Sequence, residues 1–413
     1  MSGFPIGEVA MSIRTNLVPT IALAILTLSA CATPQRLAPE PAAAMSEANP
    51  GVGNVRFLVA RDTAGFQAEA VAALSKEKAW LASNGSIGQL PPAYFLAISG
   101  GGDNGAFGAG LLNGWTAAGT RPEFKVVTGV STGALIAPFA FLGPRYDAAL
   151  EKFYTTISQK DIFKSRGMLK GVMSDAMADS APLARLIAQN TDQALLDAIA
   201  AEYAKGRVLL VGTANLDSLE PVIWNMTAIA ASKQPGALDL FRRVLLASAS
   251  IPGAFPPVMI DVNVAGGHFQ EMHADGGTMA QVFVYPPSLD GALFAQSAPR
   301  RRVLYIIRNA RLDSTWENVP RKTMSIAARA IGSLTTTQGV GDLYRIFSTT
   351  QRDGVEFNLA YIPATFTPRG KEQFDTAYMR ELYATGRRLA AAGYAWEKFP
   401  PGYERPVGAD SAP

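Results

Sequence analysis

The sequence predicts an α/β fold in which a mostly parallel sheet is covered by helices on both faces. From residue 93 onward, strand-like apolar runs alternate with segments whose apolar residues recur at helical spacing. Such alternation is typical of parallel sheets, because each helix returns the chain to the edge where the next strand begins. Hydrophobic residues make up 48% of the chain and its 38 glycines are scattered, which excludes intrinsic disorder and a collagen-like structure.

The individual elements follow from these patterns. A first strand is expected at 55–60 and a first helix at 66–81. The later strands are expected at 93–98, 125–130, 207–215, 221–227, 258–262 and 303–308. The later helices are expected at 105–117, 132–142, 182–205, 237–249, 322–348 and 374–392. For the long helix at 322–348, packing against the body is favoured over a lid or a dimer surface.

The overall composition excludes several classes of function. Lys plus Arg is 37 and Asp plus Glu is 34, a net charge of +3, which is too small for an extended nucleic-acid surface. The chain has 1 Cys and 2 His. A single cysteine excludes an intrachain disulfide and a Cys-rich zinc site. Because two histidines leave few ways to build a histidine-dependent centre, any catalysis is expected to proceed without histidine.

The amino-terminal segment predicts an export signal. Residues 17–28 form an uncharged apolar run of 12 residues, preceded by Arg14. This run is too short to span a bilayer, which needs about 20 apolar residues, and it has the length of a signal-peptide core. Glu8 is atypical of the basic start of such a signal, so both Met1 and Met11 are open as the first residue.

The only cysteine follows this run in Leu28-Ser29-Ala30-Cys31, which resembles the lipobox of bacterial lipoproteins. The resemblance implies a signal peptide at 1–30 and a lipid anchor on Cys31. Ala32 stands where an aspartate is typical of inner-membrane retention. We therefore expect an anchor in the outer membrane of a Gram-negative cell, with the protein facing the periplasm. The alternative is an uncleaved buried helix.

Gly129-Val130-Ser131-Thr132-Gly133 fits the pattern G-x-S-x-G and lies between a predicted strand and a predicted helix. In this setting Gly129 and Gly133 permit a sharp turn that exposes a serine hydroxyl above the sheet. The amino end of the following helix directs its free N–H groups to the same place. We interpret Ser131 as a catalytic nucleophile, against the alternative of a structural turn.

A second glycine cluster, Gly100-Gly101-Gly102 with Gly105, follows the strand predicted at 93–98. It also satisfies the dinucleotide-binding pattern G-x-G-x-x-G. That function requires an acidic residue at the end of the second strand, whereas Glu123 precedes the strand. We favour a second role, in which the backbone N–H groups of the glycines stabilise an oxyanion beside the serine.

A serine nucleophile needs a base. His268 follows two glycines in a predicted turn, and His273 lies on a predicted strand, on the same face as Asp275. Neither histidine carries a signature of its own. Asp275 is followed by Gly276 and Gly277, which would let the serine and a substrate approach closely. Because a carboxylate is a weak base near its ordinary pKa of about 3.9, burial or pairing with the serine must raise its basicity.

These residues resemble the motifs of the patatin-like phospholipases. In chain order the motifs are Gly100-Gly101-Gly102 with Gly105, Gly129-Val130-Ser131-Thr132-Gly133, and Asp275-Gly276-Gly277. The segment at 247–257 resembles the stretch that the family has between its serine and its aspartate. The resemblance covers about 93–290. The family usually has Arg or Lys before the fourth glycine, where this chain has Asn104.

The resemblance implies a three-layer α/β/α fold and a Ser-Asp dyad instead of a triad. It assigns Ser131 as nucleophile, Asp275 as its base, and the backbone of Gly100, Gly101 and Gly102 as the oxyanion hole. The function implied is hydrolysis of fatty-acyl esters of lipids through an acyl-enzyme. Two alternatives stay open: an acyltransferase that uses the same dyad, and a non-catalytic envelope lipoprotein that binds lipid or a partner.

The predicted organisation has five parts. They are a signal peptide at 1–30, a Pro- and Ala-rich tether at 31–54, an N-terminal extension at 55–92, the patatin-like domain at 93–290 and a C-terminal extension at 291–413. The apolar stretches at 134–142 and 253–260 either line an acyl pocket or belong to the core. The expected partner is membrane lipid or another acyl ester, with no nucleic acid.

Overall fold

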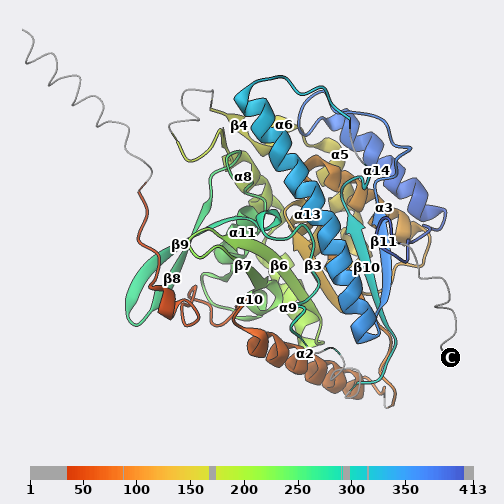
Figure 1. Cartoon of the computed structure of the whole chain (residues 1–413). Coiled ribbons are helices and arrows are strands. Elements are labelled where there is room, and N and C mark those ends of the chain that lie inside the picture. Colours follow the sequence, from red (N-terminus) through yellow and green to blue (C-terminus); the bar gives the residue numbers. More distant parts are fainter. Residues whose placement is uncertain are drawn as a thin grey trace, which may run out of the picture.

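The fold was analysed in a computed structural model of the chain, which describes residues 35–86, 88–166, 174–289, 291, 298–313 and 316–403. Figure 1 shows helices lying on both sides of a central sheet. The predicted signal peptide and Cys31 lie outside the described residues. Within the described ranges, no helix is both long enough and apolar enough to cross a membrane.

The central sheet has nine strands among the described residues, seven of them in the order β1-β7-β6-β3-β2-β10-β11. Strands β6, β3, β2, β10 and β11 run parallel, while β7, β1 and the hairpin β8–β9 are antiparallel additions. The bounds are β1 Arg56–Leu58, β2 Ala93–Ile98, β3 Val126–Val130, β6 Val208–Asn215, β7 Glu220–Asn225, β8 Val258–Val264, β9 Gly267–Asp275, β10 Arg302–Arg308 and β11 Glu356–Tyr361. The mostly parallel sheet is confirmed.

Both faces of the parallel strands are buried, as expected for such a sheet. Leu209 and Val211 of β6 belong to the main core with α3, α4, α11 and α14, whereas Val208 and Leu210 of the same strand pack with α2. Helix α13 covers the second face through a cluster that includes Ala97 of β2 (Figure 1). The result is a three-layer α/β/α fold.

The long helices are α2 Thr63–Ser83, α3 Gly105–Ala117, α4 Thr132–Leu142, α5 Asp147–Thr156, α8 Ala181–Asn190, α9 Gln193–Ala204, α11 Ala237–Ser248, α13 Thr323–Asp353 and α14 Thr376–Ala391. The short elements are α6 Gln159–Ile162, α10 Met226–Ala231, the pair β4 Lys164–Ser165 and β5 Ala178–Asp179, and the 3-10 turns η1 Ala42–Ala44, η2 Gly102–Asn104, η3 Pro144–Tyr146 and η4 Gly276–Thr278.

Most predicted elements are confirmed, but helix α5 was not predicted, and two further differences concern α8–α9 and β11. The single helix expected at 182–205 is two helices, because Asp192 caps a new one by accepting a hydrogen bond from the Leu195 N–H at 2.9 Å. Strand β11 was not predicted; it pairs in parallel with β10 at the edge of the sheet.

The described part of the predicted tether is not a free spacer. In residues 35–54, Met45 and Val52 are buried, and Asn49 forms a β-bridge with Asn263 of β8. The Gln270 N–H donates to the carbonyl of Ala38. These buried side chains and the backbone hydrogen bonds to the β8–β9 hairpin hold the segment against the body. We call residues 35–54 the N-terminal arm.

The predicted boundary at residue 290 does not separate two folded bodies. Strand β10 lies between β2 and β11 in the central sheet, and α14 packs along α3. A Cβ on Gly110 of α3 would lie 2.0 Å from the Tyr383 carbonyl oxygen of α14, so this contact needs glycine. The C-terminal segment is an integral part of the fold.

Candidate active site

Ser131 occupies the turn between β3 and α4. Its backbone has φ 55° and ψ −125°, a region that non-glycine residues rarely adopt. A Cβ on Gly133 would lie 2.2 Å from the Ile98 carbonyl oxygen, and a Cβ on Gly129 would lie 2.4 Å from the Gly133 carbonyl oxygen. Both glycines are thus required sterically, and the predicted sharp turn is confirmed.

The Asp275 carboxylate, at the end of β9, lies close enough to the Ser131 hydroxyl for the two groups to interact. It accepts a hydrogen bond from the Gly277 N–H at 2.7 Å. Burial raises the pKa of Asp275 from 3.8 to about 6, although the interactions with Ser131 and Gly277 act in the opposite direction. The structure therefore brings the predicted nucleophile and base together and makes the base stronger than an exposed aspartate.

The segment at 247–257 connects the two residues. Ser248 accepts a hydrogen bond from the Ser131 N–H at 3.0 Å and donates to the Gly212 carbonyl of β6 at 2.7 Å. The carbonyl of Ser250 accepts a hydrogen bond from the Asp275 N–H at 2.9 Å. This segment thus holds the backbones of both predicted catalytic residues at a fixed separation.

The glycine loop after β2 lies directly beside Ser131. A Cβ on Gly100 would be 3.2 Å from the Ser131 Cβ. Gly101 and Gly102 have φ 155° and 59°, and a Cβ on Gly101 would be 2.2 Å from the Asn309 carbonyl oxygen. The Gly100 N–H, however, donates to the Gln281 carbonyl at 3.1 Å, so Gly100 is already engaged. This narrows the predicted oxyanion donors to Gly101 and Gly102.

Asn309, which follows β10, holds the loop in this position. Its backbone N–H donates to Ser99 Oγ at 2.8 Å, and its Nδ2 donates to the Ser99 carbonyl at 2.9 Å. Its Oδ1 accepts from the Gly108 N–H at 3.1 Å. A residue of the C-terminal segment therefore fixes the geometry of the predicted oxyanion hole.

Asn104 stands at the position where the resembled family usually has a basic residue. Tyr378 of α14 donates to Asn104 Oδ1 at 2.6 Å, and the neighbouring Asp103 accepts from the Phe374 N–H at 3.1 Å. Burial raises the pKa of Asp103. A Cβ on Gly105 would lie 2.3 Å from Thr132 Oγ1. Hydrogen bonds from Tyr378 and from the Phe374 N–H thus anchor this end of the loop in place of a cation.

An apolar pocket of about 400 Å³ opens at Ser131. Its apolar lining comes from Leu135, Phe153, Ile157, Ile162, Leu183, Ile251, Phe255 and Phe374. Of the two stretches considered as acyl-pocket walls, 134–142 supplies Leu135 and 253–260 supplies Phe255, while most of 134–142 is buried in the core. Phe374 again comes from the C-terminal segment.

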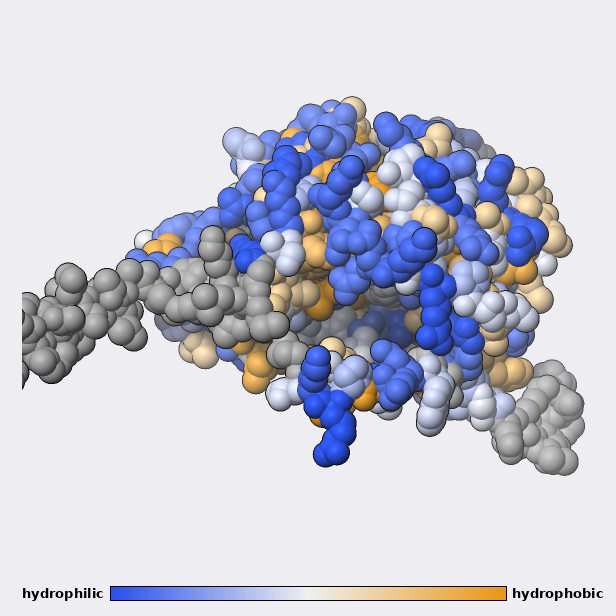
Figure 2. Space-filling model, turned by 90° about the horizontal axis from the view of Figure 1, so that it is seen from above, coloured by the Kyte–Doolittle hydropathy of each residue, from blue (hydrophilic) through white to orange (hydrophobic). Residues whose placement is uncertain are grey.

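A polar cleft of about 1860 Å³ lies on the other side of the glycine loop, between α13 and residues 366–378. Asp103 and Asn104 form one wall, and Arg311, Arg329 and Glu372 contribute charges. Seen from above, the molecule is hollowed near its centre, and hydrophilic side chains gather around the hollow (Figure 2).

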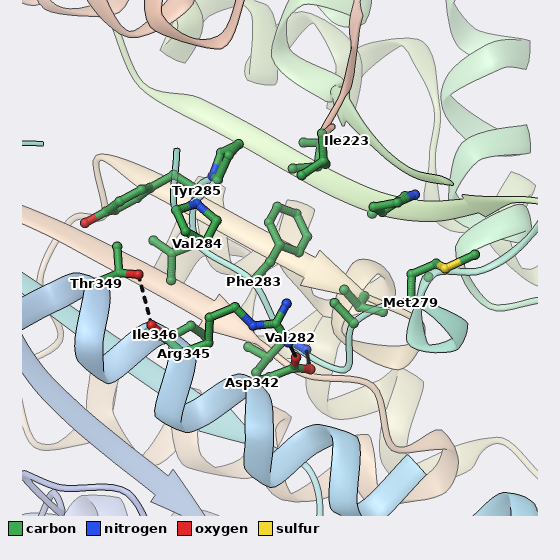
Figure 3. A pocket seen from close by; sticks show the side chains of 18 of the residues that line it. Ile223, Met279, Val282, Phe283, Val284, Tyr285, Asp342, Arg345, Ile346 and Thr349 are labelled. Atoms are coloured by element: carbon green, nitrogen blue, oxygen red, sulfur yellow. Dashed lines mark hydrogen bonds and ion pairs between the residues drawn. The ribbon is translucent and has the colours of Figure 1, made fainter. Parts of the chain in front are cut away.

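A further apolar cavity, of about 810 Å³, lies between the sheet and α13. Figure 3 shows Ile223 above it, Phe283 in its middle and Ile346 of α13 below. The Thr128 side chain on this face bonds to the Phe283 carbonyl, while Gly129 on the other face contacts α4. The cavity therefore lies on the face of the sheet opposite to the apolar pocket at Ser131.

The two histidines take no part in this arrangement. His268 is exposed and contacts Asn263 Oδ1 at 3.0 Å. His273 is buried, with Nδ1 2.9 Å from Thr213 Oγ1 and Nε2 2.8 Å from Glu271 Oε2. Burial lowers the pKa of His273. Both ring nitrogens of His273 thus contact groups other than Ser131.

Sequence patterns did not identify Ser248, Gln281 or Asn309. Gln281 contacts both loops: its carbonyl accepts from Gly100, and its Nε2 donates to the Gly277 carbonyl at 2.6 Å. The segment around Ser248 could be recognised by its resemblance to the family, but the resemblance did not indicate that Ser248 holds the backbone of Ser131. Among the described residues, no group of three or more His, Cys, Asp or Glu side chains is arranged to hold a metal ion.

Part of the chain also matches a known protein family. Residues 96–287 match the family model of the patatin-like phospholipases. No match was found among curated proteins.

Solved structures give remote likenesses. VipD from Legionella pneumophila is 11% identical over 73% of this chain and 67% of its own, with a TM-score of 0.35. Human GIVD cytosolic phospholipase A2 is 11% identical over 67% of this chain and 51% of its own, with a TM-score of 0.25. The type III effector ExoU is 13% identical over 76% of this chain and 56% of its own, with a TM-score of 0.19. At these TM-scores the likenesses carry no weight.

The family match spans the strands, glycine loop, serine turn and aspartate described above. Residues 96–287 of this chain are a patatin-like phospholipase domain.

Proposed function

We propose that this protein is a serine acyl hydrolase that cleaves fatty-acyl ester bonds of lipids. One observation carries the proposal: the hydroxyl of Ser131, held in a strained turn, lies beside the buried carboxylate of Asp275 and interacts with it. Strained backbone of this kind is concentrated at functional sites. The patatin-like domain supports lipid acyl hydrolysis in general, and the dyad is our assignment.

The reaction follows from the contacts. Asp275 takes the hydroxyl proton of Ser131 as Oγ attacks the acyl carbonyl carbon. The C–O bond to the leaving alcohol then breaks, and Asp275 returns the proton to that alcohol. Water attacks the acyl-serine, Asp275 takes a proton from the water, and the fatty acid leaves as Ser131 regains its proton. Neither metal nor cofactor is needed for these steps.

The developing oxyanion requires donors beside Ser131. We assign this role to the backbone N–H groups of Gly101 and Gly102, since Gly100 already donates to Gln281. The amino end of α4 adds its positive dipole at the same place. Loss of one such donor typically costs about 100- to 1,000-fold in rate.

The apolar pocket beside Ser131 supports an acyl chain as the group bound there. Its lining by Leu135, Phe255 and Phe374 is apolar, as an alkyl chain requires. The leaving alcohol then faces the glycine loop and the polar cleft.

The test is hydrolysis of p-nitrophenyl esters of increasing acyl length by the full chain in detergent. Ser131→Ala and Asp275→Asn are expected to lose about 10⁴-fold or more in turnover. The matched controls are Ser250→Ala, whose hydroxyl bonds only within its own segment, and Asp239→Asn on the surface of α11. Wild-type turnover in either site variant would refute the dyad.

The acyl acceptor is decided by the products. If water is the acceptor, free fatty acid accumulates even when a lipid alcohol is present. Formation of a new acyl ester on that alcohol in place of free fatty acid identifies an acyltransferase that uses the same dyad, and the hydrolase assignment is then wrong.

We further propose that Cys31 carries a lipid anchor that holds the protein at the outer membrane, facing the periplasm. The support is the apolar run at 17–28 and the sequence Leu28-Ser29-Ala30-Cys31. Intact-mass analysis should show loss of residues 1–30 and added acyl chains, and Cys31→Ser should abolish both. An unmodified cysteine in the purified protein would contradict the anchor.

A further inference from the structure

The first half of α13 and the segment before it leave large apolar side chains uncovered. Trp316 is 90% exposed, Leu334 71%, Ile331 60% and Ile326 54%. The second half of the same helix is buried, with Leu343 in the core. An exposed helix half of this kind needs an occupant, because large apolar surface facing water is unfavourable and usually marks an interaction site.

The exposed apolar residues form one stripe. Ile326, Ala330 and Leu334 are spaced by four residues, and Ala327 and Ile331 form an adjacent row with the same spacing; all five are exposed. Such spacing places side chains on one side of a helix. The opposite side supplies Arg329, Gly332, Ser333 and Thr336 to the polar cleft. We call residues 316–334 the amphipathic segment.

The charges of the amphipathic segment are mainly positive. It carries Arg321, Lys322 and Arg329 against Glu317 alone. Arg329 and Glu317 form an ion pair at 3.1 Å, which holds the stretch around Trp316 beside the helix. An exposed apolar stripe preceded by the cations Arg321 and Lys322 is the pattern of helices that lie in the interface of a membrane.

The amphipathic segment also stands beside the site. Trp316 and Arg329 line the polar cleft, whose far wall includes Asp103 and Asn104. The neighbouring Gly102 lines the apolar pocket at Ser131. An α-helix is about 10 Å across, so a surface in contact with the outer side of α13 lies about one helix diameter from the mouth of this cleft.

We propose that the amphipathic segment docks on an anionic lipid surface, with Ile326, Ile331 and Leu334 in the interface. The proposal rests on the proposed function only in that docking would bring lipid substrate to the cleft. The docking itself is independent of the chemistry at Ser131 and is measured separately from it.

The single cysteine of the chain makes a site-specific test available. In full-length protein with Cys31→Ser, an environment-sensitive fluorophore is attached through Leu334→Cys or Ile331→Cys. The matched controls are Leu219→Cys and Val71→Cys, which are 75% and 50% exposed on other parts of the molecule. Vesicles of phosphatidylglycerol with phosphatidylcholine are expected to shift the emission of the labels at 331 and 334 to the blue and to protect them from an aqueous quencher.

The controls are expected to stay in water, even if residues 17–28 hold the protein near the bilayer. Equal shifts at 334 and 219, or no shift at 334, would overturn the proposal. A blue shift at 334 that grows with protein concentration in the absence of vesicles would assign the stripe to a second copy of the chain, and would overturn it as well. If vesicles of pure phosphatidylcholine gave the same blue shift at residue 334 as the anionic vesicles, the requirement for anionic lipid would be overturned.

A kinetic arm separates docking from chemistry. Ile331→Asn with Leu334→Asn should lower hydrolysis of vesicle lipid at least tenfold, because both substitutions replace an apolar side chain that would be buried in the interface by a polar one. Turnover of a soluble ester should stay within twofold, and Leu219→Asn should change neither rate. If the wild-type protein hydrolyses no ester, the proposed function fails while the fluorescence result still decides the docking.

Discussion

In the proposed dyad, burial of Asp275 is what would let a carboxylate serve as the base for a serine without histidine. An exposed aspartate is almost fully ionised at neutral pH and takes up a proton poorly. Here burial raises the pKa to about 6, and the Gly277 N–H holds one carboxylate oxygen. The proposed base thus has a pKa close to working pH, where general-base catalysis is most efficient.

This pKa predicts the pH dependence of the reaction. Because Asp275 must be deprotonated to accept the serine proton, kcat/KM for a soluble ester should rise about tenfold per pH unit below about 6 and level off above it. The measurement is a pH–rate profile with a substrate that does not titrate. A profile that is flat from pH 4.5 to 8 would exclude Asp275 as the base.

Ser248 is predicted to position Ser131 without touching the substrate. Ser248→Ala leaves the Ser131 N–H and the Gly212 carbonyl without their hydrogen-bond partner. We expect kcat to fall about 10- to 100-fold with KM nearly unchanged, since a small displacement of the nucleophile is costly.

Ser250→Ala is the matched control, because its hydroxyl bonds to the Leu246 carbonyl while its backbone still holds Asp275. It should keep kcat within about twofold. Equal losses in both variants would mean that the segment acts by general stability alone.

Among individual residues, the sequence predicts those whose backbone geometry requires glycine on either side. Ser131 and Asp275 could be recognised because Gly129, Gly133 and Gly276 flank them. Gln281 and Asn309 could not be recognised, because each acts through hydrogen bonds to backbone groups more than 100 residues away or on another loop. Such contacts leave no local pattern in the sequence.

Strand β9 links the N-terminal arm to Asp275. Glu271, His273 and Asp275 alternate along the strand on its buried face, and Glu271 pairs with Arg56 of β1. Trp224 Nε1–H donates to Thr213 Oγ1, which also lies 2.9 Å from His273 Nδ1. His273 Nε2 lies 2.8 Å from Glu271 Oε2, so this ring joins the strand to the ion pair with Arg56.

Loss of Arg56 should loosen this strand. Arg56→Met leaves the buried Glu271 carboxylate with one partner fewer, and removing one member of a buried pair typically costs about 3–5 kcal/mol. We expect a lower Tm and faster amide exchange over residues 267–275, measured by mass spectrometry. Arg61→Met, which breaks an ion pair that is 44% exposed on the arginine side, is the control and should change little.

An unchanged exchange rate in β9 after Arg56→Met would show that the ion pair does not hold the strand.

Elements bounded by glycine or by a strong change of pattern were predictable, and others were not. Strand β2 and helices α3 and α4 begin and end as expected, because glycines and polar residues flank their apolar runs. Strand β11 mixes Glu356 and Asn358 with apolar residues, since it is the last strand of the sheet. Its place depends on pairing with β10, which no local pattern encodes.

The whole molecule differs from the expected series of separate parts. The parallel sheet requires β10 and β11, and Gly110 and Gly114 of α3 make close contact with the backbone of α14. Motifs concentrate in 93–290, and the sequence beyond them carries no chemistry of its own, so a boundary at 290 was the natural expectation. The contacts that remove this boundary are tertiary.

A chain that ends at residue 290 is therefore predicted not to fold. Strand β2 would become an exposed edge, and the buried surface of α3 would face water. We expect aggregation, or a soluble chain without a cooperative thermal transition, when it is compared with the full chain by circular dichroism. A cooperative transition together with ester hydrolysis would show that the C-terminal segment is dispensable.

Covalent trapping of the nucleophile tests the central proposal most directly. A fluorophosphonate probe is incubated with the full chain, and the modified residue is mapped by mass spectrometry. We predict a single adduct on Ser131, no adduct in Ser131→Ala, and labelling slowed at least a hundredfold in Asp275→Asn. An unlabelled Ser131 in folded protein, or equal labelling rates with and without the Asp275 carboxylate, would contradict the Ser-Asp dyad.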